Sequence, residues 1–301
     1  MTTNGSTTVS LRTVLRWELI LLSGCFVLGL LVFGLGRIFS PGATFSFPAY
    51  SLESIMTGKL FYYLAVGFAA QLIDGALGMA YGVTSTSLLL SAGVSPSVAS
   101  ASVHAAEVFT TGASGISHWK FGNVRKDLFV KLAVPGAAGA ALGAYVLTSV
   151  DGMVIRPYVA GYLLVMGLII FLKAVGKTIF PRELKGVRLL ALFGGFVDAS
   201  GGGGWGPVVT STLISGGHQA RLTIGTTNAV EFLVSLTAAG VFSLFVGLAG
   251  WQVVIGLILG GVLAAPLGAY VCHKINHRVC MFLVGTLITI LSLRTIILSI
   301  N

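Results

Sequence analysis

The stretches IDGALGMAYGVTSTSLLLSAG (residues 73–93) and VDASGGGGWGPVVTSTLISGG (residues 197–217) decide the fold of this chain. They align without a gap from Asp74 on Asp198, so the chain contains an internal duplication. Both copies lie in strongly apolar sequence, where a charged side chain requires a partner or a wet cavity. A duplicated polar motif that is interrupted by glycine at membrane depth indicates the substrate site of a transporter.

The composition places the chain in a membrane. Of its 301 residues, 55% are hydrophobic and 9% are charged, and the mean hydropathy is +0.95. A soluble domain carries about 25% charged residues. We therefore expect a polytopic membrane protein whose surroundings are a lipid bilayer.

The net charge of +9 does not indicate nucleic acid. The lysines and arginines lie in short loops between apolar runs instead of forming one patch, which is the pattern of membrane topology. The sequence also lacks a GxxxxGK[ST] nucleotide loop, an HExxH motif and cysteines at metal-binding spacing. We therefore expect no nucleic-acid partner, no cofactor and no metal.

The N-terminal region, residues 1–55, is predicted to hold one extra transmembrane helix at Leu19–Leu35. This apolar run is long for a signal peptide, and no clean cleavage site follows it. The stretch from Ser40 to Ser54 contains proline, glycine and several hydroxyl residues, which predicts an external loop.

The remaining apolar segments form two sets with the same order of lengths. The first set covers 58–73, 76–92, 98–117, 127–149 and 156–175, and the second covers 187–199, 203–216, 221–247, 251–272 and 279–298. The last three segments of each set have about 20 residues, which is enough to cross the hydrocarbon core. The first two are shorter and are separated by glycine-rich sequence, which predicts short re-entrant or broken helices.

Each set contains an odd number of crossings, so the second repeat is predicted to be inverted relative to the first. With a cytoplasmic N-terminus, most basic residues also fall inside; these are Lys120, Arg125, Lys126, Lys173, Lys177, Arg182, Lys185, Arg188, Lys274 and Arg278. The predicted fold is an all-α polytopic membrane protein of two inverted-topology repeats, at 56–176 and 189–301. A basic cytoplasmic loop at 177–188 joins them.

The fourth segments repeat a run of small residues. GAAGAALGAYV (136–146) matches GVLAAPLGAYV (261–271). Small residues at this density permit close contact between helix backbones, so we assign both runs to packing.

The glycine-rich turn after each aspartate is the first candidate for chemistry. Asp74 and Asp198 are interpreted either as caps of the following half-helix or as groups that handle protons or cations. After Asp198, the run from Gly201 through Gly202, Gly203 and Gly204 to Trp205 leaves backbone amides open at a helix start, which suits an anion. The alternative is that these glycines only turn the chain. The counterpart in the first copy lies at Gly78, with Tyr81 aligned to Trp205.

The third segments carry the second group of candidates. His104, Glu107 and Thr111 in VHAAE (103–107) and beyond align with Asn228, Glu231 and Ser235, and spacings of three and four put each trio on one helical face. Ser102 aligns with Thr226, and Thr227 lies beside it. We interpret Glu107 and Glu231 either as functional groups or as structural hydrogen-bonding groups, and His104 either as a coupling residue or as a packing residue.

VDASGGGGWGPVVTSTLISGG, followed by TIGTTNAVEF (223–232), resembles the sulfite exporter TauE/SafE family. The likeness covers roughly residues 58–298, and the first helix lies outside it. The resemblance implies outward transport of sulfur-containing anions across the inner membrane, with Gly202 to Trp205 and Thr226 to Asn228 at the substrate site. The first half departs from the motif, because Met79, Ala80 and Tyr81 stand where the second copy has Gly203, Gly204 and Trp205.

These observations predict a secondary transporter in the bacterial inner membrane that exports sulfite or a related organosulfonate or sulfur oxyanion by alternating access. The substrate would contact Gly78, Ser102, His104, Gly202 to Trp205, and Thr226 to Asn228. The carboxylates Asp74, Glu107, Asp198 and Glu231 are candidates for proton coupling. An anion channel is the alternative; a membrane enzyme using Glu107, Glu231 and His104 is disfavoured because no nucleophile-base arrangement is visible. A homodimer is left open.

Overall fold

Helices form along the described chain wherever an apolar run continues without a turn signal. The computed structural model describes residues 58–77, 79–120, 122–176, 186–247, 250–274 and 277–300, and no strand occurs within them. All of them belong to one unit, Ser51–Asn301. The predicted helix at Leu19–Leu35 and Gly78 lie outside the described residues.

The helices follow the predicted segments closely. The first half contains α3 (Gly58–Leu77), α4 (Tyr81–Ser91), α5 (Pro96–Lys120), α6 (Lys126–Ser149) and α7 (Gly152–Ala174). The second half contains α8 (Val187–Gly201), the π-helical segment η1 (Gly206–Thr210), α9 (Ser211–Ser215), α10 (Ala220–Phe245), α11 (Trp251–Lys274) and α12 (His277–Ile300). The short elements are α4, with 11 residues, in the first half, and α8, η1 and α9, with 15, 5 and 5 residues, in the second half. Helix α3 reaches 20 residues and includes Asp74, so the first break falls later than the hydropathy indicated.

Four helices of the described chain are long and apolar enough to cross a membrane: α6, α7, α10 and residues Arg278–Ser299 of α12. Helix α5 has 25 residues but is not among them. Its buried face carries polar side chains, including Ser100, Ser102, His104, Glu107 and Thr111. These polar side chains make α5 less apolar than the four helices above, although it has the length to cross a membrane.

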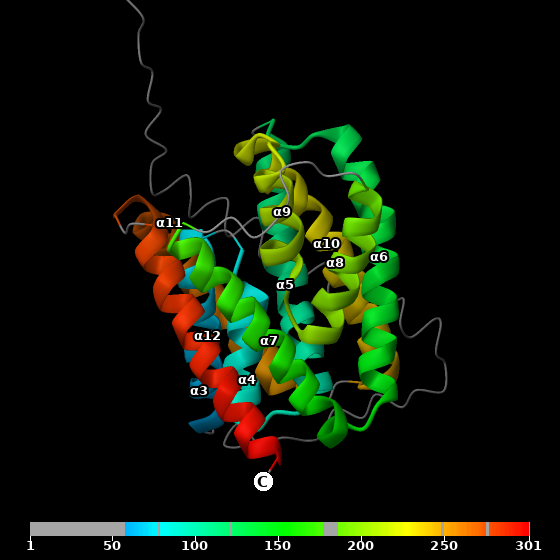
Figure 1. Ribbon diagram of the computed structural model, residues 1–301, viewed down its shortest axis with the longest axis vertical. Coiled ribbons are helices and arrows are strands. Elements are labelled where there is room, and N and C mark those ends of the chain that lie inside the picture. The colour runs from blue at the N-terminus through cyan, green and yellow to red at the C-terminus, as the bar shows by residue number, and fades with distance from the viewer. Residues whose placement is uncertain are drawn as a thin grey trace, which may run out of the picture. The chain divides into compact units, whose positions relative to one another are not determined.

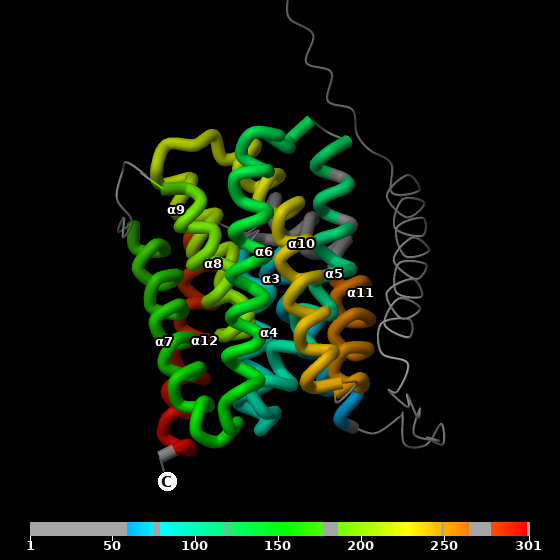
Figure 2. The backbone as a smooth tube through the Cα atoms, turned by 90° about the vertical axis from the view of Figure 1, so that its right-hand side faces the viewer, coloured from blue at the N-terminus to red at the C-terminus, as the bar shows by residue number. Residues whose placement is uncertain are grey.

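The two halves interlock in space. Helix α3 packs on α11, and α8 packs on α6. Helices at equivalent positions in the two halves also pair, α5 with α10 and α7 with α12. Helix α3 begins and α4 ends at the end of the bundle where α12 ends, whereas α8 begins and α9 ends at the opposite end (Figures 1 and 2). Each short pair therefore enters the bundle and returns to the same end.

Glycine permits the close crossing of α6 on α8. A Cβ at Gly139 would collide with the carbonyl of Leu192, and one at Gly143 would lie 3.0 Å from the carbonyl carbon of Phe196. From the other side, a Cβ at Gly195 would meet the backbone of Gly136. The run at 136–146 is thus confirmed as a packing surface.

Two arginines hold the end of α4. Arg156 of α7 donates to the carbonyl of Leu90 at 2.8 Å, and Arg294 of α12 donates to the carbonyl of Ser91 at 2.9 Å. Cations at a helix C-terminus satisfy carbonyls that have no partner in the helix and oppose its dipole. These contacts with α4 account for the positions of both arginines.

Candidate functional site

Two helix breaks, between α3 and α4 and between α8 and η1, provide the framework of the site. In the first, Asp74 Oδ1 accepts from the backbone N–H groups of Ala80 at 2.8 Å and Tyr81 at 3.2 Å. In the second, Asp198 Oδ1 accepts from the N–H of Trp205 at 2.8 Å. Each carboxylate lies in the last part of one helix and caps the start of the next segment. The half-helix starts thus already hold an anionic group from the chain itself.

The two breaks touch at Gly82 and Gly203. A Cβ at Gly82 would lie 2.7 Å from Cα of Gly203 and 3.0 Å from Oε1 of Glu107. Gly202 and Gly203 have positive φ values, +72° and +144°, which L side chains rarely adopt. Thr86 of α4 donates to the carbonyl of Gly202 and ties the breaks together. Here glycine is required by both conformation and space.

Trp205 anchors the second break instead of lining the site. Its side chain is completely buried, and Nε1 donates to the carbonyl of Thr227 at 3.2 Å. The ring packs where a Cβ at Gly136 would come within 2.8 Å of it. The ring therefore fixes η1 between α6 and α10.

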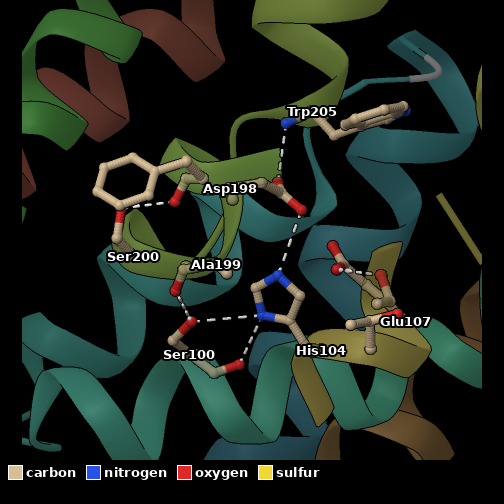
Figure 3. A network of polar contacts seen from close by, with 12 residues as sticks. Ser100, His104, Glu107, Asp198, Ala199, Ser200 and Trp205 are labelled. Atoms are coloured by element: carbon tan, nitrogen blue, oxygen red, sulfur yellow. Dashed lines mark hydrogen bonds and ion pairs between the residues drawn. The ribbon is translucent and has the colours of Figure 1, made fainter. Parts of the chain in front are cut away.

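His104 links α5 to α8 (Figure 3). Its Nε2 lies 3.2 Å from Oδ2 of Asp198, and its Nδ1 lies 2.8 Å from the carbonyl oxygen of Ser100. Ser100 Oγ also donates to the carbonyl of Ala199 at 2.6 Å. His104 is fully buried and Asp198 is nearly so. The pair thus spans the two halves of the chain at the glycine turn.

The two glutamates have different surroundings. Glu107 of α5 is buried, and its Oε2 accepts from Ser235 Oγ of α10 at 3.2 Å. Thr111 donates to the carbonyl of Glu107 at 2.6 Å and is therefore occupied within its own helix. Glu231 makes no hydrogen bond or ion pair with the part of the chain that the structure describes. Equivalent sequence positions thus differ in their polar contacts.

A small cavity of about 20 Å³ lies where these elements meet. A cavity of that size holds about one water molecule. Seven of the candidates from the sequence line it: Asp74, Glu107, Asp198, Gly203, Gly204, Asn228 and Glu231. The duplicated residues therefore converge from both halves of the chain.

The other candidates lie elsewhere. His104 and the N–H of Trp205 both contact the wall residue Asp198, while Gly202, next to Gly203 in the chain, accepts from Thr86. Thr226 donates to the carbonyl of Leu222 and accepts from the N–H of Arg125 at 2.9 Å, so it fixes the start of α6. Thr227 accepts from Thr210 Oγ1 at 3.0 Å, next to η1.

Ser102 is buried on α5, and its Oγ has no hydrogen-bond partner within the described part of the chain. A Cβ at Gly250 would lie 3.2 Å from this oxygen, so the side chain points to the start of α11. Ser102 does not line the cavity. Its alignment with Thr226 therefore gives no direct evidence for substrate contact.

Further residues line or support the cavity; Tyr81 and Thr111 were already singled out in the sequence, and the others were not among its candidates. The cavity is also lined by Met79, Tyr81, Gly82, Val83, Thr110, Thr111, Gly206 and Pro207. Tyr162 of α7 donates to the carbonyl of Gly203 at 2.8 Å, and Lys173 donates to that of Pro207 at 3.2 Å. Thr110 and Pro207 follow the duplicated residues in sequence and could have been included; Tyr162 and Lys173 carried no such signal.

His104, Glu107 and Asp198 have nitrogen and oxygen atoms within 4.8 Å of one another. We assign no metal ion to them, because the imidazole of His104 and the carboxylate of Asp198 are already paired with each other. What the arrangement provides is a set of glycine backbones, exchangeable protons and helix starts around one buried point.

Paired helix breaks that meet at a buried polar point inside a bundle of membrane-length helices define a membrane transporter. The sulfite exporter TauE/SafE family model matches residues 63–295, and the chain belongs to this family. A similar relative is the Bacillus subtilis (strain 168) protein named "Probable membrane transporter protein YtnM", which is 45% identical over 249 residues. That match covers 79% of this chain and 83% of the relative. No solved structure matches the chain.

Proposed function

We propose that this chain is a secondary transporter that exports sulfite or a related organosulfonate or sulfur oxyanion across the bacterial inner membrane by alternating access. The observation that carries the proposal is the meeting of two broken-helix starts at one cavity. Helix starts present backbone N–H groups and the positive end of the helix dipole, which attract anions. The family description supplies the sulfur-containing class of anion.

Two inverted repeats are part of the proposal. The pairing of α3 with α11 and of α8 with α6 exchanges equivalent partners between the halves. The two short pairs also enter from opposite ends (Figure 2). Both features support a pseudo-two-fold axis in the membrane plane, around which the halves rock. The N-terminus is proposed to be cytoplasmic because that orientation places most basic loops inside.

The size of the cavity supports alternating access. At about 20 Å³ it is small for an anion of several heavy atoms. In this proposal the breaks separate at the crossing of Gly82 and Gly203 when the anion binds. A carrier that closes around its site has this property, whereas an anion channel needs a continuous path.

The carboxylates support a role for protons. Asp74, Glu107, Asp198 and Glu231 all line the cavity, and four negative charges would repel an anion. Proton binding would remove this repulsion. An inside-negative potential by itself already drives anions outward, by about 2.3 kcal/mol per charge per 100 mV.

Counterflow in proteoliposomes tests the transport proposal. Vesicles loaded with unlabelled anion are placed in labelled anion at the same pH, using sulfite, sulfate, thiosulfate, sulfoacetate and simple carboxylates in turn. We expect saturable accumulation with at least one sulfur-containing anion and a weaker response to carboxylates. Flux without counterflow would favour a channel, and turnover of the substrate in detergent would favour an enzyme.

Proton coupling has its own test. Net flux is measured with an imposed pH gradient for the native protein, Glu107→Gln and Glu231→Gln. The response to the gradient should fall in at least one variant if these carboxylates carry the coupling. An unchanged response in both would remove them from it.

A further inference from the structure

The contact between His104 and Asp198 specifies the position of a proton. His104 Nδ1 lies 2.8 Å from the carbonyl oxygen of Ser100, which can only accept a hydrogen bond, so Nδ1 carries a hydrogen. The hydroxyl of Ser100 uses its own hydrogen on the carbonyl of Ala199 at 2.6 Å. It therefore cannot supply one to Nδ1, and the tautomer of His104 is fixed.

With Nδ1 protonated, a neutral imidazole has a lone pair at Nε2. This atom faces Oδ2 of Asp198 at 3.2 Å, and an ionised carboxylate offers only lone pairs as well. The contact thus requires one further proton, on Nε2 or on Oδ2. Building on the transport function proposed above, we infer that His104 and Asp198 together hold the coupling proton, and that one proton is carried with each anion.

The equivalent pair at the first break, Asp74 and Asn228, has no such group. Asn228 occupies the position of His104, and its Nδ2 donates to the carbonyl of Ile224 at 3.2 Å, which repeats the bond from His104 to Ser100. The side-chain amide does not titrate in the physiological range. Asp74 is instead held by two backbone N–H groups, from Ala80 and Tyr81. The duplication has preserved the geometry and left a proton-binding pair at the second break alone.

The pair is placed to link proton and anion. Asp198 accepts from His104 with one oxygen and from the N–H of Trp205, at the start of the second half-helix, with the other. A proton from water that binds Nε2 forms an imidazolium and offsets the charge of Asp198. An anion at this helix start then meets one negative charge fewer. Proton and anion therefore bind together and move in the same direction.

Loss of the proton reverses both effects. It returns the imidazole to the neutral form, and the Nε2 lone pair then opposes Oδ2 of Asp198. The contact of His104 with Asp198 is lost, and the hydrogen bond from Ser100 to Ala199 is then the remaining bond of this network between α5 and α8. Proton release thus weakens the junction of the two halves at the point where the anion leaves.

Other ionisable groups surround the pair and share its field. They are Glu107 on α5, Asp74 on α3, Tyr81 on α4, Tyr162 and Lys173 on α7, and Glu231 on α10. Lys173 donates to the carbonyl of Pro207. Among them, the geometry assigns the shared proton to His104 and Asp198, because these two side chains contact each other directly.

The first test uses the native protein. Sulfoacetate is added to purified protein in weakly buffered detergent at a series of pH values that extends to alkaline pH, where the pair has lost its proton; a pH dye reports proton uptake while calorimetry reports binding. At the alkaline end of the series we expect about one proton taken up for each anion bound. Binding without proton uptake at every pH overturns the inference and leaves the transport function standing. Absence of binding or counterflow by every anion in the panel removes the transport function, and the inference with it.

The second test uses matched variants in proteoliposomes. His104→Asn introduces the residue found at position 228, and His118→Asn makes the same change near the end of α5, away from the cavity. A lumenal pH dye and labelled anion give the number of protons moved per anion, whatever the rate. This ratio should fall to near zero in His104→Asn and keep the native value in His118→Asn. A native ratio in His104→Asn overturns the inference; if that variant does not fold, the uptake measurement on the native protein decides.

Discussion

Replacing Gly203 by alanine tests the close crossing on which the site depends. The residue has a φ of +144°, and an added Cβ would collide with the backbone of Val83 and lie 2.7 Å from Cα of Gly82. A residue held in such a backbone region costs about 1 to 3 kcal/mol. Overpacking costs about 1 to 3 kcal/mol more, because the obstacle is backbone and cannot rotate away. The expected loss in the free energy of unfolding is therefore about 2 to 6 kcal/mol.

The assay is the melting temperature of the purified protein in detergent, with counterflow measured in parallel. Gly161→Ala on α7 is the matched control, because its Cβ would meet no atom within 4 Å. Alanine at that helical position should stabilise the protein by about 0.5 to 1 kcal/mol. We expect Gly203→Ala to melt clearly lower and to lose counterflow, since the two breaks cannot close. If the two variants melt alike, the breaks do not touch at Gly203 and the reasoning is wrong.

Three further predictions concern the surroundings of the site. Trp205→Phe removes the N–H bonded to the carbonyl of Thr227 and should lower stability by at least about 1 kcal/mol, seen as a lower melting temperature; an unchanged value would mean that this bond contributes nothing. Arg156→Ala and Arg294→Ala should each cost about 0.3 to 1 kcal/mol by removing a cation from the end of α4, seen as a lower melting temperature; an unchanged value in both would contradict this. Thr226→Val should destabilise the protein while its apparent affinity for the transported anion in counterflow stays native, because Thr226 holds the N–H of Arg125 and does not line the cavity. A change in affinity would instead return Thr226 to the substrate site.

The helices and the position of the site could be predicted because both depend on local sequence. Runs of about 20 apolar residues fix spanning helices, and a polar motif in an apolar chain has to face a cavity or a partner. The duplication then showed which polar residues belong together. Seven of the candidate residues line one cavity as a result.

The roles of individual side chains could not be predicted, because they depend on contacts between distant elements. The GTTN run (225–228) is continuous in sequence, yet its side chains diverge around α10. Thr226 reaches the start of α6, Thr227 reaches Thr210, and Asn228 alone lines the cavity. Helical geometry places consecutive residues about 100° apart, so the side chains of a continuous polar run cannot all face one ligand.

The aspartates change how an anion site at these breaks has to be understood. From the sequence, open N–H groups in the glycine turn were expected to receive the substrate. In the structure Asp74 and Asp198 already accept from Ala80, Tyr81 and Trp205. A substrate anion that uses the same donors competes with a carboxylate of the chain. A protonated His104 can draw Asp198 toward itself, whereas Asp74 has only backbone donors. The second break is therefore the one that can release its backbone donor, the N–H of Trp205, to the substrate. The glycine-rich copy therefore supplies both the space and the exchangeable partner, and the bulkier first copy supplies the fixed wall.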